Sequence, residues 1–140
     1  MRATSRVMAT PLLLLAASFA LCAEGPRSTC VVDGDTFWLN GEKVRMADIN
    51  APETHGAACP AEQALGEAAT RRLIVLLNQG SVTLEAGSRD RDRYGRLLRT
   101  VTRHGRSLGG QLVAEGLAEV WQGRRGDWCA RLGAAASLRR

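Results

Sequence analysis

The sequence predicts an α+β fold that is mainly β, in which five short strands form a small barrel and about three helices pack on it. Asn40-Gly41 separates two alternating apolar runs, which indicates a tight hairpin because both residues tolerate the positive φ of a type I′ turn. Residues 61–78 show a long stretch of helical periodicity, and short strand-like runs follow it. The length of 140 residues suits a single domain.

The hairpin forms the first part of the predicted sheet. Its first arm covers residues 28–33 and 36–39 and is bent at Gly34, and its second arm covers residues 43–49. Residues 50–60 are expected to form a loop, because two prolines and a glycine interrupt them.

This hairpin brings oxygen-bearing side chains together. Asp35 begins one arm, and Asn50 and Glu53 follow the end of the other, so folding the arms back on each other places these residues near one another. Asp33 and Asp48 add two further carboxylates to the same segment. Hard oxygen donors of this kind are the ligands that a calcium ion prefers.

Helices and strands alternate through the rest of the chain. Pro60 opens the long helix and Gly80 follows its end, while Ser107 caps a second helix that Gly116 stops. The sequence also predicts strands over 81–85, 97–102 and 117–121, a polar loop over 87–96, and a short helix from Trp128 onward. An OB-like barrel is one closed arrangement for strands of this length and order.

The amino terminus has the composition of a secretory signal peptide. A basic start, a short apolar run and small residues occupy positions 1–23, so we expect a mature domain over 24–140 that is periplasmic or secreted. A lipoprotein modification at Cys22 and an uncleaved helix are the alternatives. We expect no membrane segment after cleavage and a monomer. Three cleavage points fit the sequence, after Ala20, Cys22 or Ala23.

The four cysteines indicate the compartment of the protein, and its net charge indicates the kind of partner it binds. Cysteines at this frequency fit an oxidising compartment, and cleavage after Cys22 would leave one disulfide, for which we favour Cys59 with Cys129, and one free thiol. A zinc site is disfavoured, because no cysteine pair has CxxC spacing and there are only two histidines. The net charge of +5 favours polyanionic partners.

Four motifs follow one another along the chain. They are Val32-Asp-Gly-Asp-Thr36, Arg45 with Pro52-Glu53 after it, Asp92-Arg-Tyr-Gly-Arg96, and Glu115-Gly-Leu-Ala118. Together they resemble the thermonuclease, or staphylococcal-nuclease-like (SNase-like), family over nearly all of the expected mature chain. The resemblance implies an OB-like barrel that cuts DNA and RNA with the help of calcium and leaves 3′-phosphate ends.

The resemblance also implies roles for residues that suit this chemistry. Arg45 and Arg96 would stabilise charge on the phosphoryl group, since guanidinium groups bind phosphate oxygens in pairs and keep their proton. Glu53 would position or deprotonate the attacking water as a general base. Arg93 and Tyr94 would contact a neighbouring phosphate of the substrate.

By the same resemblance, Asp35 would bind calcium directly, the main-chain carbonyl of Ala51 would add a ligand, and Asp33 would lie in the outer shell. The sequence departs from the family at Asn50, where a second calcium-binding aspartate is usual. An amide offers an oxygen without a charge, so we expect weaker calcium binding unless Asp48 compensates.

Two other classes of function stay open at this point. The first is a catalytically weakened, OB-like nucleic-acid-binding module of the cell envelope, and the second is a structural or partner-binding envelope protein. Glu53 favours the nuclease, because a carboxylate near bound phosphates would repel the ligand of a pure binding module. Trp121 and Trp128 are candidates either for base stacking or for packing in the core.

Overall fold

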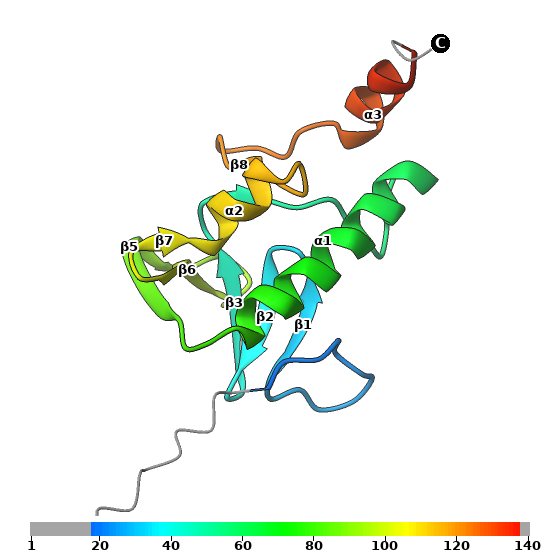
Figure 1. Ribbon diagram of the computed structural model, residues 1–140. Coiled ribbons are helices and arrows are strands. Elements are labelled where there is room, and N and C mark those ends of the chain that lie inside the picture. Colours follow the sequence, from blue (N-terminus) through cyan, green and yellow to red (C-terminus); the bar gives the residue numbers. More distant parts are fainter. Residues whose placement is uncertain (1–17, 138–140) are drawn as a thin grey trace, which may run out of the picture.

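The computed structural model describes residues 18–137 (Figure 1). Most of the expected signal peptide therefore lies outside the described residues. The helices are α1 (Pro60–Asn78), α2 (Leu108–Ala114) and α3 (Trp128–Ser137). The strands are β1 (Cys30–Asp33), β2 (Thr36–Leu39), β3 (Glu42–Met46), β4 (Ile49–Asn50), β5 (Thr83–Arg91), β6 (Leu97–Arg103), β7 (Arg106–Ser107) and β8 (Glu119–Val120). No helix within 18–137 is long and apolar enough to cross a membrane.

The main sheet is mixed and has the strand order β1-β2-β3-β6-β5, with β7 paired to β6. Its neighbours are antiparallel except for β3 and β6, which run parallel, and β4 and β8 form a separate antiparallel pair. The α+β class with three helices is confirmed. A closed five-stranded barrel is not confirmed, because the outer strands β1 and β5 do not pair with each other in the described part of the chain.

The outer edge of β1 is covered by the segment that precedes it. The N–H of Val31 donates to the carbonyl of Ala20 at 2.8 Å, and the N–H of Cys22 donates to the carbonyl of Val31 at 2.9 Å. A disulfide between Cys22 and Cys30 ties the two segments together. These hydrogen bonds use the groups of Val31 that an adjoining strand would need, so β5 cannot pair there.

The hairpin between β2 and β3 forms as expected. Asn40 and Gly41 have φ values of 50° and 83°, and Leu39 pairs directly with Glu42 across the turn. Two boundaries differ from the prediction. The expected strand over 43–49 is divided by a turn between β3 and β4, and β5 continues to Arg91 through the first half of the expected polar loop.

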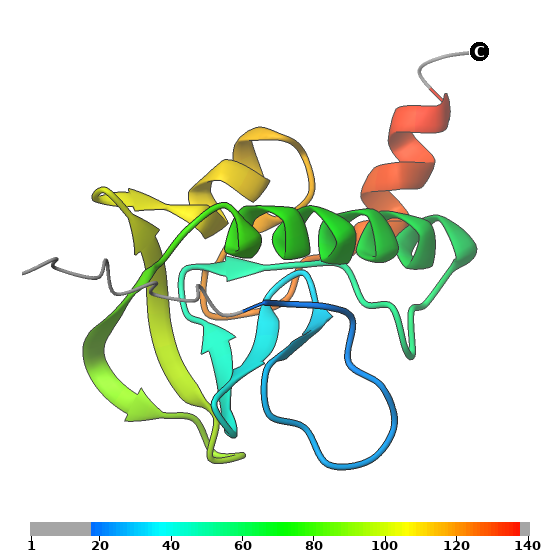
Figure 2. The same ribbon diagram turned by 60° about the horizontal axis from the view of Figure 1, so that its bottom comes forward.

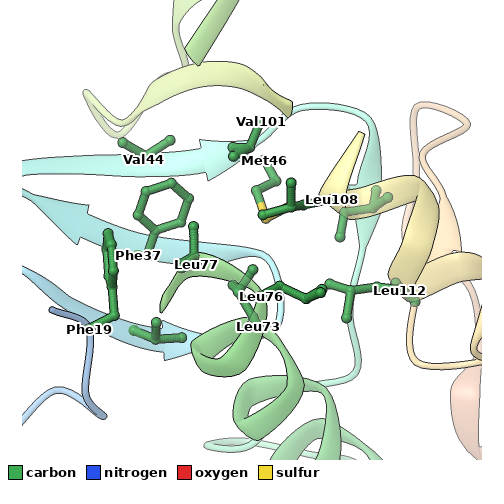
Figure 3. Packing of buried hydrophobic residues seen from close by; sticks show 13 residues of the cluster. Phe19, Phe37, Val44, Met46, Leu73, Leu76, Leu77, Val101, Leu108 and Leu112 are labelled. Atoms are coloured by element: carbon green, nitrogen blue, oxygen red, sulfur yellow. The ribbon is translucent and has the colours of Figure 1, made fainter. Parts of the chain in front are cut away.

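The core lies between the sheet and the helices, with α1 lying across the sheet (Figure 2). The apolar face of α1 packs against sheet residues, and α2 closes one end of the cluster (Figure 3). The buried side chains include Phe37, Val44, Met46 and Val101 from strands, Leu73, Leu76 and Leu77 from α1, and Leu108 and Leu112 from α2. Burial of these side chains provides most of the driving force for folding.

The segment before β1 belongs to this core. Phe19 is 6% exposed and its ring meets that of Phe37 edge to face at 5.8 Å. The side chain of Asn78 bonds the backbone N–H and carbonyl of Phe19, each at 2.8 Å. Each of the three expected cleavage points would therefore remove Phe19 from the core.

All four cysteines are paired in the structure. The disulfide between Cys59 and Cys129 confirms the favoured pairing and joins the start of α1 to α3. In the uncleaved chain Cys30 is bonded to Cys22, so the free thiol expected after cleavage behind Cys22 is not tested and stays a prediction. That expectation depended on losing Cys22 with the signal peptide.

Candidate active site

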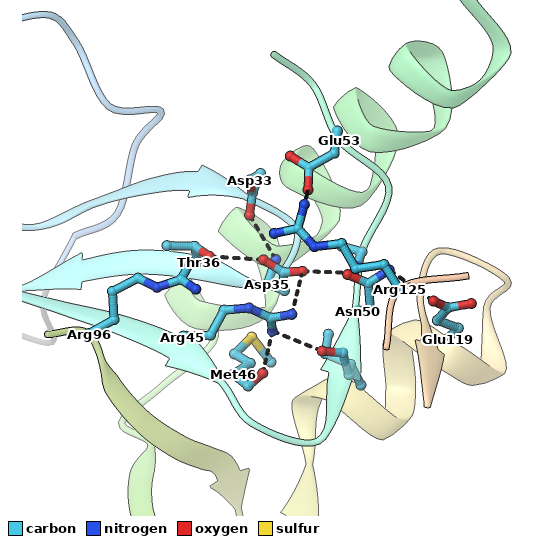
Figure 4. A network of polar contacts seen from close by, with 12 residues as sticks. Asp33, Asp35, Thr36, Arg45, Met46, Asn50, Glu53, Arg96, Glu119 and Arg125 are labelled. Atoms are coloured by element: carbon cyan, nitrogen blue, oxygen red, sulfur yellow. Dashed lines mark hydrogen bonds and ion pairs between the residues drawn. The ribbon is translucent and has the colours of Figure 1, made fainter. Parts of the chain in front are cut away.

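The site is built around the buried side chain of Arg45, which is 7% exposed on β3 (Figure 4). Its Nη2 lies 3.4 Å from Oδ2 of Asp35, and its Nη1 donates to the carbonyls of Met46 and Ile49, the latter at 2.8 Å. One guanidinium thus neutralises a buried carboxylate and also holds the turn after β3. Its five donors in a fixed plane make this possible.

Asp35 lies at the bend between β1 and β2 and is itself held by several donors. The Ala51 N–H donates to its Oδ2 at 2.8 Å, and the Thr36 hydroxyl donates to its Oδ1 at 2.9 Å. Asp33 accepts from the Asp35 N–H at 3.2 Å, so both acids share one turn. Gly34 between them has no room for a side chain, because a Cβ there would lie 2.7 Å from that of Ala69 in α1.

Glu53 follows β4 on a segment that packs tightly on α1. A Cβ on Gly66 would lie 2.6 Å from the carbonyl oxygen of Glu53, which makes glycine necessary at that point of the helix. The N–H of Glu53 donates to Oε2 of Glu62 at 3.2 Å. Its carboxylate accepts from Nη1 of Arg125 at 2.7 Å. Burial raises the pKa of Glu53, and the positive charge of Arg125 opposes this rise.

The turn between β5 and β6 presents the second group of predicted residues. Nε of Arg96 pairs with Oδ2 of Asp92 at 2.6 Å, and its guanidinium lies 5.5 Å from the ring centre of Tyr94. Arg93 donates to the hydroxyl of Tyr94 at 2.6 Å. Tyr94 is 69% exposed, so the ring forms a platform open to solvent beside two guanidinium groups.

Beside this turn lies a cavity of about 630 Å³ whose lining is rich in arginine. Trp121 lines it, with its ring 5.7 Å from the Arg45 guanidinium, whereas Trp128 is buried beneath Arg131. Trp121 is therefore the tryptophan whose ring faces the cavity, while Trp128 is buried, and a stacking role for Trp121 stays a prediction. Five arginines line the cavity, namely Arg45, Arg89, Arg93, Arg96 and Arg125.

The structure brings most of the predicted site residues together. Five of them gather at the end of the β2–β3 hairpin that lies opposite its turn, namely Asp33, Asp35, Arg45, Asn50 and Glu53 (Figure 4). The side chain of Arg96 lies near that of Arg45 (Figure 4). Arg93 and Tyr94 share the cavity with Arg45 and Arg96. The catalytic, substrate-binding and metal-binding roles of these residues stay predictions.

Asp48 has a different surrounding from the one that strand alternation predicts. The turn between β3 and β4 interrupts the alternation, and Asp48 accepts a hydrogen bond from the hydroxyl of Ser107 at the start of α2. This hydrogen bond holds one carboxylate oxygen of Asp48 against the start of α2. Compensation for Asn50 by Asp48 stays a prediction.

Two site residues have no clear signal in the sequence. Arg125 is one of two adjacent arginines in a loop rich in glycine, and only the folded chain shows that it pairs with Glu53. Glu119 lies opposite Asn50 in the pairing of β4 with β8, and its Oε1 accepts from Nδ2 of Asn50 at 2.9 Å. Both contacts link segments about 70 residues apart, as the separations of 72 and 69 residues show.

The donors around Asn50 fit a hard cation. Asn50 is 2% exposed, and its Oδ1 is a buried acceptor to which no group within residues 18–137 donates a hydrogen bond. A buried acceptor in this state is costly unless a donor or a cation reaches it. The described residues contain no group of three or more His, Cys, Asp or Glu side chains that could hold a metal. The available set is therefore poor in charge, which fits weak rather than tight calcium binding.

The acid Asp33 gives the metal-free protein a distinctive pH dependence. Burial and the neighbouring Asp35 charge raise the pKa of Asp33 from 3.8 to about 8. Because the folded state holds this proton more tightly, the stability that Asp33 contributes is fully present below pH 3.8 and is lost as pH rises through about 8. We expect Asp33→Asn to remove this fall and to stabilise the chelator-treated protein at pH 8 by a few kcal/mol, since one pKa unit corresponds to about 1.4 kcal/mol.

Urea unfolding with a chelator at pH 5 and pH 8 measures this effect. Titration of Asp92 does not interfere between pH 5 and pH 8. Burial raises the pKa of Asp92, but the hydrogen bonds from Arg96 outweigh burial and lower it, so the stability that Asp92 contributes is lost only at more acidic pH. Glu67→Gln on the exposed face of α1 is the matched control and should behave like the parent. Equal pH dependence in the parent and in Asp33→Asn would contradict the prediction.

Comparison with known proteins gives the family of the chain. A family model described as staphylococcal nuclease homologue matches residues 43–132, a stretch that contains Arg45, Glu53 and Arg96 but begins after Asp35. Endonuclease YncB of Bacillus subtilis is 42% identical over 95 residues, which cover 64% of this chain and 44% of that protein.

Two further Bacillus subtilis proteins are similar. The SPbeta prophage-derived endonuclease YokF is 42% identical over 95 residues, covering 64% of this chain and 31% of that protein. Endonuclease YhcR is 33% identical over 102 residues, covering 65% of this chain and 8% of that protein. The chain spans less than half the length of each relative. Since the family model covers well over half of the chain, the chain belongs to the staphylococcal nuclease homologue family.

Proposed function

We propose that this protein is a calcium-dependent endonuclease that hydrolyses phosphodiester bonds of DNA and RNA and leaves 3′-phosphate ends. The observation that carries the proposal is a cavity lined by five arginines, one of which, Arg125, pairs with the carboxylate of Glu53. The family and the relatives named as endonucleases support the same reaction.

The residues of the site divide the work of this reaction. Arg45 and Arg96 bind the phosphoryl oxygens and stabilise the charge that grows on them as the attacking oxygen approaches. Glu53 holds the attacking water and accepts its proton, which its partly buried position and raised pKa favour. Arg93 and Tyr94 contact a neighbouring phosphate, and the exposed ring of Tyr94 offers a stacking surface.

Asp35, Asn50 and the carbonyl of Ala51 would hold the calcium ion, with Asp33 in the outer shell. Such an ion would supply Lewis-acid stabilisation of the negative charge on the phosphoryl group. The absence of charge on Asn50 predicts that calcium in the millimolar range is needed, as in many extracellular proteins.

We also propose that the protein acts outside the cytoplasm as a monomer. Two disulfides support an oxidising compartment, and the composition of the first residues supports export. Nucleic acids are the expected partners.

The test is degradation of labelled single-stranded DNA, duplex DNA and RNA by the purified protein, with calcium titrated from none to tens of millimolar. We expect cleavage that depends on calcium, products that a 3′-phosphatase converts to 3′-hydroxyl ends, and no cleavage with a chelator. Cleavage that persists with the chelator would exclude calcium dependence. Products that carry a 5′-phosphate instead would exclude the proposed bond polarity.

The uncharged Asn50 favours one second candidate, a nucleic-acid-binding module that has lost catalysis. It predicts that the folded protein retards single-stranded DNA in a gel without cutting it at any calcium concentration. The same titration separates the two functions.

A further inference from the structure

The amide of Asn50 has a fixed orientation. Asn50 and Glu119 are directly opposed in the pairing of β4 with β8, and Nδ2 of Asn50 donates to Oε1 of Glu119 at 2.9 Å. A carboxylate is only an acceptor, so the amide must present its NH₂ group to Glu119. The oxygen of the amide is then turned away from Glu119, and this is the buried Oδ1 that has no donor.

Glu119 is held in place from its other side. The N–H of Gly126 donates to Oε1 of Glu119 at 2.6 Å, and the guanidinium of Arg131 pairs with Oε2. A Cβ on Gly126 would collide with the same carboxylate, so a larger residue there would force the end of the Glu119 side chain to move. With 15% of its side chain exposed, Glu119 is an anchored carboxylate rather than a free surface acid.

Asn50 also lies beside the proposed ligand Asp35. The N–H of the next residue, Ala51, donates to Oδ2 of Asp35 at 2.8 Å, and Figure 4 shows Asn50 between Asp35 and Glu119. The side chain of Asn50 therefore faces two different groups. On one side it must donate a hydrogen bond to Glu119, and on the other it must offer an oxygen to the proposed cation. An amide meets both demands, whereas a carboxylate at position 50 would face Glu119 with no proton to share.

We propose that Glu119 is a positioning residue of the metal site, which orients the amide of Asn50 so that its oxygen is available to the cation. This inference rests on the proposed calcium site. It also explains the departure from the family pattern, because Glu119 makes asparagine, rather than aspartate, the compatible residue at position 50. The effect of a substitution at Asn50 should therefore depend on the residue at position 119.

The proposal predicts a reversal of the expected charge effect. Asn50→Asp adds a negative charge to the site, yet it should not tighten calcium binding and should lower the urea midpoint, because a buried carboxylate then meets the half-buried carboxylate of Glu119. Glu119→Gln should weaken calcium binding about tenfold, since a glutamine amide can either donate or accept and no longer fixes Asn50. The double variant Asn50→Asp with Glu119→Gln should regain stability and bind calcium about tenfold more tightly than Asn50→Asp alone.

Isothermal titration with CaCl₂ on chelator-stripped protein measures the affinities, and urea unfolding with a chelator measures the stabilities. Neither readout requires cleavage. Glu115→Gln, which alters a surface carboxylate paired with Arg72, is the matched control and should not rescue Asn50→Asp. Tighter calcium binding by Asn50→Asp with Glu119 intact would overturn the proposal.

The stability measurements separate failure of this inference from failure of the calcium proposal. If no variant binds calcium but Glu119→Gln still rescues the stability of Asn50→Asp, the orienting contact stands and the calcium assignment falls. If Glu119→Gln gives no rescue of stability, Glu119 does not hold position 50 and the inference falls, whatever the calcium affinity.

Discussion

Glu53→Gln is expected to lower the rate of phosphodiester cleavage by ~100-fold or more while the protein stays folded. Glutamine keeps the shape of the side chain and its acceptor for Arg125, but it cannot take a proton from the attacking water. The loss should appear in kcat at saturating calcium and substrate, because the residue acts in the reaction rather than in binding. Single-turnover cleavage of a labelled DNA strand measures it.

The comparison for this variant is Glu67→Gln, which removes an exposed carboxylate from the same part of the chain. Its cleavage rate should equal that of the parent. Urea midpoints of both variants report whether the fold is kept. Undiminished cleavage by a folded Glu53→Gln protein would assign the general base to another group.

Arg45→Lys is expected to lower both activity and stability, although it keeps the positive charge. One ammonium group cannot reach Asp35 and the carbonyls of Met46 and Ile49 together, so buried acceptors lose their donors. We expect a loss of about 1–3 kcal/mol in the free energy of unfolding. Loss of paired donors to the phosphoryl group should reduce cleavage by ~100-fold.

Arg106→Lys makes the same exchange at an exposed position of β7 and should change neither quantity. Urea unfolding and single-turnover cleavage are measured for both proteins at saturating calcium. An Arg45→Lys protein with the stability of the parent would show that the contacts to the turn after β3 do not contribute. Parental cleavage would remove Arg45 from the proposed catalytic set.

The elements that the sequence predicted correctly follow from local physical rules. The hairpin depends on two residues that accept positive φ, and α1 depends on apolar spacing and on a proline at its start. The extension of β5 over residues 86–91 was missed, because five of these six residues are polar or glycine and the extension depends on pairing with β6. The closed barrel was not confirmed because the edge of β1 is covered by residues that had been assigned to a signal peptide.

The candidate site also combines residues that local motifs predict with residues that only long-range contacts reveal. Arg45, Glu53 and Arg96 lie in short motifs whose spacing is visible in the sequence. Arg125 and Glu119 act through contacts with residues about 70 positions away, and nothing in the residues around them indicates those partners. The hydrogen bond from Asn50 to Glu119 also forms only when β4 and β8 pair.

The disulfide between Cys59 and Cys129 has a consequence for survival among proteases. The outer part of β5 is exposed, and exposed segments are where proteases cut most readily. Because a covalent bond joins the two ends of the 70-residue span, one backbone cut anywhere inside it leaves the two fragments in a single molecule. A nicked molecule would therefore keep Glu53 and Arg96 on connected pieces that can hold their shared core together.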